Sequence, residues 1–125
     1  GNDFIMYNFH SVEGYSKVGS YTGNGNADGT FVYTGFRPAW LMMKVAVGGT
    51  GNWFILDSTR SAINEADDRL NADTTGAEST SNSDIDFLSN GFKIRTASTS
   101  GINQNTDTHI YLAFAEAPFK FANAR

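Results

Sequence analysis

The feature that most constrains the fold is a series of short apolar runs that end at clusters of glycine and asparagine. The longest run, residues 39–47, follows Pro38 and stops at Gly48 and Gly49. Proline removes a backbone donor at the entry, and paired glycines favour a turn at the exit, so a strand is preferred to a short helix. The nearly continuous hydrophobicity predicts a strand that is buried on both faces or central in a sheet.

The same pattern recurs along the chain. Runs rich in aromatic and β-branched residues predict further strands at residues 4–9, 15–21, 30–36, 53–57, 85–88, 92–96 and 109–115. Short turns at residues 48–52 and 89–91 predict two hairpins. Seven or eight strands without a substantial helix indicate an all-β protein, an antiparallel β-sandwich of jelly-roll-like form.

Length and composition set the domain count and exclude several functions. The 125 residues predict a single domain over residues 1–125, in which residues 1–13 are a linker or a strand shared with a preceding repeat or a neighbouring subunit. The chain has no cysteine, which removes disulfides and thiolate chemistry. A net charge of −4 argues against nucleic acid as a partner. No apolar run approaches the ~20 residues of a membrane span, so no membrane insertion is expected.

The first and last apolar runs resemble each other. When residues 4–9 are placed over residues 109–114, Ile5 falls on Ile110 and Phe9 on Phe114. Two amphipathic strands can share such a pattern by chance. Alternatively, the first run is the last strand of a preceding repeat and acts as an assembly strand, because an unpaired strand readily completes another sheet. That strand would consist of Phe4, Ile5, Met6, Tyr7 and Phe9.

Two long polar segments, residues 58–83 and 98–107, predict loops that are functional or mobile. The first contains the weak calcium candidates Asp67, Asp68 and Asp73, but their spacing is not that of an EF-hand loop. No other cofactor and no catalytic residue is expected.

A pair of carboxylates, Asp84 and Asp86, flanks Ile85 and would share one face of a strand. With Glu78 they are the carboxylates that a glycan depolymerase would need. A solvated sheet edge is the preferred interpretation. His10 and His109 have no metal-binding spacing, so each is interpreted as a packed or surface side chain.

The aromatic residues allow two interpretations. They could stack on the faces of sugars, or they could belong to the core, which is preferred. Both tryptophans begin strong strands, so each is expected to be half-buried near a sheet end. The set consists of Trp40, Trp53, Tyr33 and Phe54.

Several segments together resemble a known family. These are residues 14–25, the stretch Gly-Phe-Arg-Pro-Ala-Trp at residues 35–40, residues 85–93 and the ending at residues 111–119. They resemble a domain of unknown function found in bacteriophage tail-fibre and other virion structural proteins. The resemblance implies a non-enzymatic component of the virion surface. Its implied partners are copies of itself, other virion proteins and a host-surface glycan or protein.

Within that resemblance, three roles remain open. The domain is expected to be part of a tail fibre or appendage with a role in host recognition. A capsid decoration protein and a self-assembling filament subunit joined by strand exchange are the alternatives. The motif residue Arg37 is expected to satisfy backbone carbonyls or a carboxylate such as Asp57, which would form a structural polar cluster with Arg60.

Overall fold

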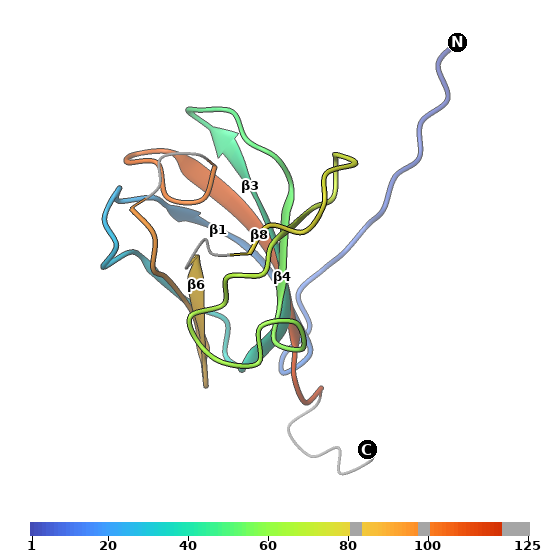
Figure 1. The fold of residues 1–125 in the computed structure, drawn as a ribbon. Helices are drawn as coiled ribbons and strands as arrows, with labels where there is room; N and C mark the ends of the chain where they lie inside the picture. Colours follow the sequence, from blue (N-terminus) through green and yellow to red (C-terminus); the bar gives the residue numbers. More distant parts are fainter. Residues whose placement is uncertain (81–83, 98–100, 119–125) are drawn as a thin grey trace.

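The computed structural model describes residues 1–80, 84–97 and 101–118, and these residues form eight strands and no helix (Figure 1). The prediction of an all-β protein is therefore confirmed. In chain order the strands are β1 (Ser16–Thr22), β2 (Phe31–Tyr33), β3 (Pro38–Val47), β4 (Phe54–Asp57), β5 (Leu70–Asn71), β6 (Ile85–Leu88), β7 (Gly91–Ile94) and β8 (Thr108–Ala115). Among the described residues, no helix is long and apolar enough to cross a membrane.

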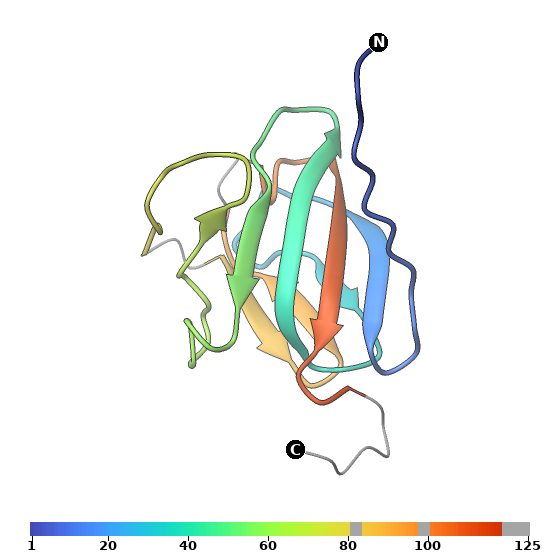
Figure 2. The same ribbon diagram turned by 90° about the vertical axis from the view of Figure 1, so that its right-hand side faces the viewer.

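The strands form two antiparallel sheets that pack face to face as a β-sandwich. The larger sheet has the order β1-β8-β3-β4-β5, and the smaller one has the order β2-β7-β6. Figure 2 looks onto the outer face of the larger sheet, with the smaller sheet behind it. Both predicted hairpins are present, since β3 pairs with β4 and β6 pairs with β7.

The apolar run at residues 39–47 becomes β3, which lies between β8 and β4. Its prediction as a central strand is confirmed, but only one of its faces is fully buried. Leu41 and Met43 point into the sandwich and are buried, whereas Trp40 and Met42 point outward and are half-buried.

The core lies between the two inner faces. Its largest fully buried side chains include Leu41, Met43, Leu56, Ile85, Phe87, Phe92 and Ile94. Aromatic rings also pack edge-to-face in the core: the ring centroids of Phe92 and Tyr111 are 5.3 Å apart, and the ring planes make an angle of 77°. Each such side chain contributes about 1.5–3 kcal/mol by leaving water, so this core suffices without disulfides.

A close approach between β1 and β8 depends on a glycine. A Cβ atom at Gly19 would lie 2.7 Å from the hydroxyl oxygen of Tyr111. The missing side chain therefore makes room for the buried tyrosine ring, which fills the inner face at this edge of the sheet.

The structure differs from the sequence-based expectation at residues 4–9. They are extended but belong to neither sheet, and their side chains are exposed. The predicted strand therefore does not take a final strand's position in its own sheet, and β8, the strand it resembles, is paired on both sides by β1 and β3.

The polar segment at residues 58–83 is described up to residue 80, and it contains the short strand β5. Isolated bridges join Ala66 to Ile85 and Arg69 to Ser79. This part of the predicted loop is therefore tied to both sheets. Of the second polar segment, residues 98–107, the structure describes residues 101–107.

Candidate assembly surface

The outer face of the five-stranded sheet is apolar across its four longest strands. On β3, β4 and β8 the side chains that point away from the core in the middle of the sheet are large and hydrophobic, and β1 adds Val18; all of them are half-buried or exposed. We call this set the outer face: Val18, Trp40, Met42, Ile55, Ile110, Leu112 and Phe114. Antiparallel sheets with one solvated side usually carry polar residues there. An apolar outer face of this extent indicates an interaction surface.

The aromatic residues of this face form a cluster around Phe114. The Phe114 ring lies 5.7 Å from Trp40, 5.8 Å from Tyr15 and 6.2 Å from Phe9, measured between ring centroids. The contacts with Tyr15 and Phe9 are edge-to-face, a favourable arrangement for aromatic pairs. Phe9 thus connects the segment before β1 to β8, the strand next to β1 in the sheet.

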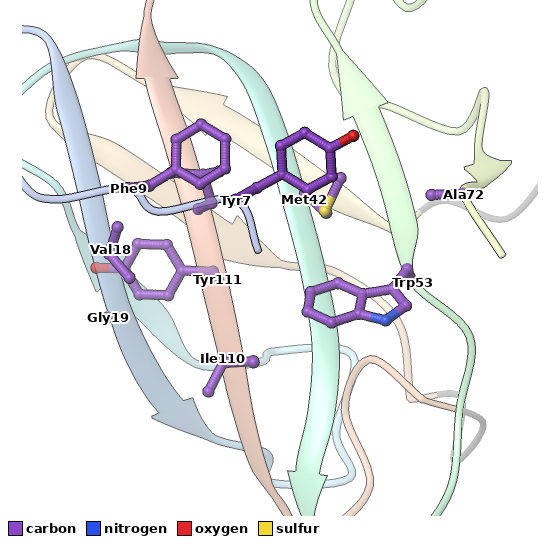
Figure 3. A pocket seen from close by; sticks show the side chains of 10 residues that line it. Tyr7, Phe9, Val18, Gly19, Met42, Trp53, Ala72, Ile110 and Tyr111 are labelled. Atoms are coloured by element: carbon purple, nitrogen blue, oxygen red, sulfur yellow. The ribbon is translucent and has the colours of Figure 1, made fainter. Parts of the chain in front are cut away.

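A groove of about 830 Å³ runs over the outer face (Figure 3). Its floor includes Val18 of β1, Ile110 of β8 and Met42 of β3, and Trp53 stands at one side. Tyr7 and Phe9 lie over β8 and β3 at the other side. The volume is within the range of pockets that hold drug-sized ligands, so the groove can take more than one large apolar side chain.

The residues before β1 form an exposed apolar segment, which we call the arm and define as residues 1–9. The exposed fractions are 88% for Phe4, 83% for Ile5, 79% for Met6, 79% for Tyr7 and 56% for Phe9. Figure 1 shows the arm leaving the sheet on its outer side and running away from the body of the domain. Large apolar side chains in a row are costly to leave in water.

The root of the arm is fixed to β1. The Ser16 hydroxyl donates to the carbonyl of His10 at 3.0 Å, and the backbone N–H of Val18 donates to the Ser11 hydroxyl at 3.0 Å. A bridge between Val12 and Ser16 closes the turn that leads into the strand. The direction in which the arm starts is therefore set by hydrogen bonds, whereas its apolar part is held by few contacts.

Lys44 of β3 lies beside this face, and its charge is directed to the rim. The Lys44 ammonium group lies 5.6 Å from the centroid of the Trp53 ring and donates to the carbonyl of Gly51 at 2.7 Å. Its aliphatic part can cover apolar surface while the charge stays hydrated. Lys44 therefore leaves the centre of the groove apolar.

The predicted polar cluster is present only in part. Arg60 donates to the Asp57 carboxylate at 2.6 Å and to the Glu78 carboxylate at 2.9 Å. Burial acts to raise the pKa of Asp57, but hydrogen bonds from Arg60 and Thr59 outweigh it and lower that pKa. Arg37 does not join them. It donates instead to the carbonyl of Phe87 at 3.1 Å and pairs at 3.2 Å with Glu116, which directly follows β8.

The carboxylate pair is also arranged differently from the expected solvated edge. Asp84 is fully buried and forms an ion pair with Arg69 at 3.0 Å, whereas Asp86 is half-buried and lies 3.4 Å from Arg95. Burial raises the pKa of Asp84 to about 6, although the charge and hydrogen bond of Arg69 counteract part of this effect. The carboxylates considered for glycan cleavage, including Glu78, thus each have an arginine partner.

The calcium candidates are not gathered into a site. In the described parts of the chain, no three potential metal-ligating side chains come together. Asp73 instead accepts a hydrogen bond from the backbone of Trp53, and the backbone N–H groups of Asp67 and Asp68 both donate to the Ser61 hydroxyl. These residues stabilise the loop.

The two histidines have different environments. His109 is buried and stacks on Tyr21 with ring centroids 4.9 Å apart, and burial lowers its pKa despite the opposing charge of Asp107. His10 lies exposed at the root of the arm. The prediction of packed or surface histidines agrees with both positions.

The aromatic residues divide between the core and the outer face. Phe54 belongs to the core and Tyr33 is exposed on β2. Trp40 and Trp53 are half-buried near the sheet ends, as predicted, but both lie on the outer side rather than in the core. Sequence reasoning missed the outer face, although β3 and β8 carry large apolar residues at both alternating positions.

Comparison with known families gives one match. The model of the family described as domain of unknown function (DUF7483) matches residues 1–118, which include the arm and all eight strands. None of the curated proteins compared with the chain matches it, and none of the solved structures does.

Proposed function

We propose that this chain, which belongs to the family of domains of unknown function DUF7483, is a non-catalytic structural module of a virus particle that joins neighbouring subunits through its outer face. In this role it would be part of a tail fibre or appendage at the virion surface. Its partners would be copies of itself and other virion proteins.

The single observation that supports assembly is the apolar outer face with the exposed arm beside it. The centre of a protein interface is depleted in charge and enriched in aromatic residues and methionine. The outer face combines Trp40, Met42 and Phe114 with aliphatic neighbours, and the arm adds Phe4 and Tyr7. Surfaces of this kind are rarely left exposed in proteins that act as monomers.

The viral setting is supported by the resemblance of residues 35–40 and 85–93 to a domain of virion structural proteins. The non-catalytic role is supported by the way in which the acidic side chains are used. Asp57, Asp84 and Asp86 neutralise arginines within the fold. Each of them has a structural task that explains its position without a reaction.

The mass of the purified chain and the shape of its assemblies test this proposal. We expect light scattering after size exclusion to give a mass above the 13.6 kDa of one chain, and electron microscopy to show closed particles of a few copies rather than open fibres. A chain that stays monomeric at every concentration, and that binds no other component of a purified particle, would contradict the proposed function.

A second candidate function is host recognition by the polar loop, and one observation favours it. Residues 72–80 are exposed, yet their base is fixed by the ion pairs of Arg60 with Glu78 and of Arg69 with Asp84. A polar loop that is already ordered loses less entropy on binding.

A glycan array with the purified domain tests recognition by the loop. We expect binding that is lost when Thr74 and Thr75 are both replaced by alanine, and retained in the control Thr22→Ala on the edge strand β1. If neither the domain nor its assemblies bind any host-surface glycan or protein, the recognition role is wrong and the structural role stands alone.

A further inference from the structure

We propose that two copies of this chain associate with their outer faces opposed, and that the arms of both copies are buried as an apolar layer between the two five-stranded sheets. This inference rests on the proposed assembly function and names the partner as a second copy. It assigns the arm to a contact between subunits rather than to strand insertion into a sheet.

The alternation of side chains along the arm is the first argument. In an extended segment, successive side chains point to opposite sides. Tyr7 and Phe9 both point to the chain's own sheet, since both line the groove and Phe9 contacts Phe114. Ile5 shares their side of the arm, and Phe4 and Met6 therefore point away from the sheet.

The outward side of the arm thus carries two large apolar side chains, Phe4 and Met6, between Asn2 and Asn8. A segment that only covered its own sheet would be expected to carry polar residues on the side that faces water. Phe4 and Met6 instead remain 88% and 79% exposed. A second apolar surface over the arm would bury them, and this chain offers one such surface, its own outer face in another copy.

The positions of arm and face are compatible with two-fold symmetry. The arm leaves the domain on the same side as the outer face, as Figure 1 shows. When two copies meet about a two-fold axis, each arm therefore lies between its own sheet and the sheet of the partner. Such a contact is self-complementary and closed, which is the commonest symmetry of soluble homo-oligomers.

In a two-fold dimer the backbones of the two arms could also hydrogen-bond to each other. Among the described backbone hydrogen bonds of turns and loops, none involves residues 1–9. Buried backbone N–H and carbonyl groups must be paired. Two arms related by a two-fold axis that is perpendicular to them run antiparallel, and in that arrangement they can hydrogen-bond to each other as a two-stranded ribbon.

The apolar area is sufficient for a stable dimer. A large aromatic side chain buries roughly 150–250 Å². The arm has five large apolar side chains that are mostly exposed. Two arms would therefore remove on the order of 1,200 Å² or more from water before the sheets are counted, and a standard interface buries about 1,200–2,000 Å² in total.

The first experiment measures the dimer dissociation constant of the full chain by sedimentation. The double variant Phe4→Ser, Met6→Ser removes the outward side of the arm and leaves Tyr7 and Phe9 on the sheet. We expect dimerisation to weaken by roughly 100-fold or more, since four buried side chains per dimer are lost. Phe31→Ser, Tyr33→Ser is the matched control, because it removes two exposed aromatic residues from β2 in the other sheet.

The second experiment locates the arm by cross-linking. Because the natural chain has no cysteine, each introduced thiol is unique. A tagged Met6→Cys chain is mixed with an untagged Met42→Cys chain and treated with a bismaleimide. We expect a cross-linked product that contains both chains, since Met42 lies in the groove that the partner's arm would cover.

The outcomes separate this inference from the proposed function. If the Phe4→Ser, Met6→Ser variant self-associates as strongly as the wild type, the inference is wrong and the assembly function is left intact. A chain that carries both Met6→Cys and Met42→Cys gives a further check. If its two thiols cross-link only within the same chain, the arm closes on its own sheet and the inference is also wrong. A wild type that is monomeric at every concentration would contradict both.

Discussion

The carboxylate of Asp84 lies 3.0 Å from the guanidinium group of Arg69, and only 1% of the Asp84 side chain is exposed. Arg69 also lies over the ring of Phe54, with its guanidinium carbon 4.4 Å from the ring centroid. The pair joins the segment of β5 to the start of β6, so it ties the long loop to both sheets. A buried ion pair in this position fixes the place of the loop.

Replacing Arg69 with alanine is expected to lower the free energy of unfolding by about 3 kcal/mol. The change would leave the Asp84 carboxylate buried without a counter-charge, and breaking such pairs is strongly destabilising. Chemical denaturation with urea measures this difference. A loss below about 1 kcal/mol would mean that the pair is accessible to water in solution.

The pH dependence of stability tests the environment of Asp84. Burial raises its pKa to about 6 from the ordinary 3.8, so the folded protein favours the protonated carboxyl. The contribution of the protonated Asp84 carboxyl to folding stability is fully present below about pH 4 and is lost as the pH rises through about 6. We expect Asp84→Asn to flatten the change of melting temperature between pH 4 and 6, measured by circular dichroism.

The control for this titration is Asp3→Asn, which changes an exposed carboxylate of the arm. It should leave the pH profile of the wild type unchanged. If Asp84→Asn and Asp3→Asn give the same profile as the wild type, the buried pair does not control stability in this range.

The partners of Arg60 and Arg37 predict unequal effects of the same substitution. Arg60 is 24% exposed and contacts two carboxylates, whereas Arg37 is 40% exposed and pairs with a mostly exposed Glu116. We expect Arg60→Ala to cost about 1–2 kcal/mol and Arg37→Ala about 1 kcal/mol or less, because exposed pairs contribute little. Thermal unfolding of both variants checks the order, and a larger loss for Arg37→Ala would reverse our assignment.

The contact between Gly19 and Tyr111 predicts a further loss of stability. A Cβ atom at position 19 would lie 2.9 Å or less from the nearest Tyr111 ring carbon and hydroxyl, so the buried ring would have to move. Overpacking of this kind costs about 1–3 kcal/mol. We expect Gly19→Ala to be destabilised by that amount in urea denaturation, and Ser20→Ala, on the exposed side of β1, to be neutral.

Much of the fold could be predicted from sequence because its strands correspond to strong local sequence patterns. The β3–β4 and β6–β7 hairpins follow from apolar runs joined by short turns, and the alternation of Phe92 and Ile94 with polar neighbours indicates which side is buried. These features depend on residues close in sequence. Periodicity alone was enough to find them.

The assembly surface could not be predicted in the same way. β3 and β8 are apolar at both alternating positions, so sequence does not distinguish the core side from the outer side. The partner of Arg37 was also out of reach, because Glu116 approaches it only after β3 and β8 pair. The residues of the arm were interpreted as a candidate assembly strand, but the sequence did not indicate that they lie outside both sheets.

The outer face itself is tested most directly by sedimentation equilibrium of the wild type and of Ile110→Lys. Ile110 lies on the floor of the groove and is partly exposed, so a lysine there adds charge to the face with little effect on the core. We predict a wild-type mass of at least twice 13.6 kDa, and a variant that is folded by circular dichroism and has the mass of one chain. A variant that self-associates as the wild type does would contradict assembly through this face.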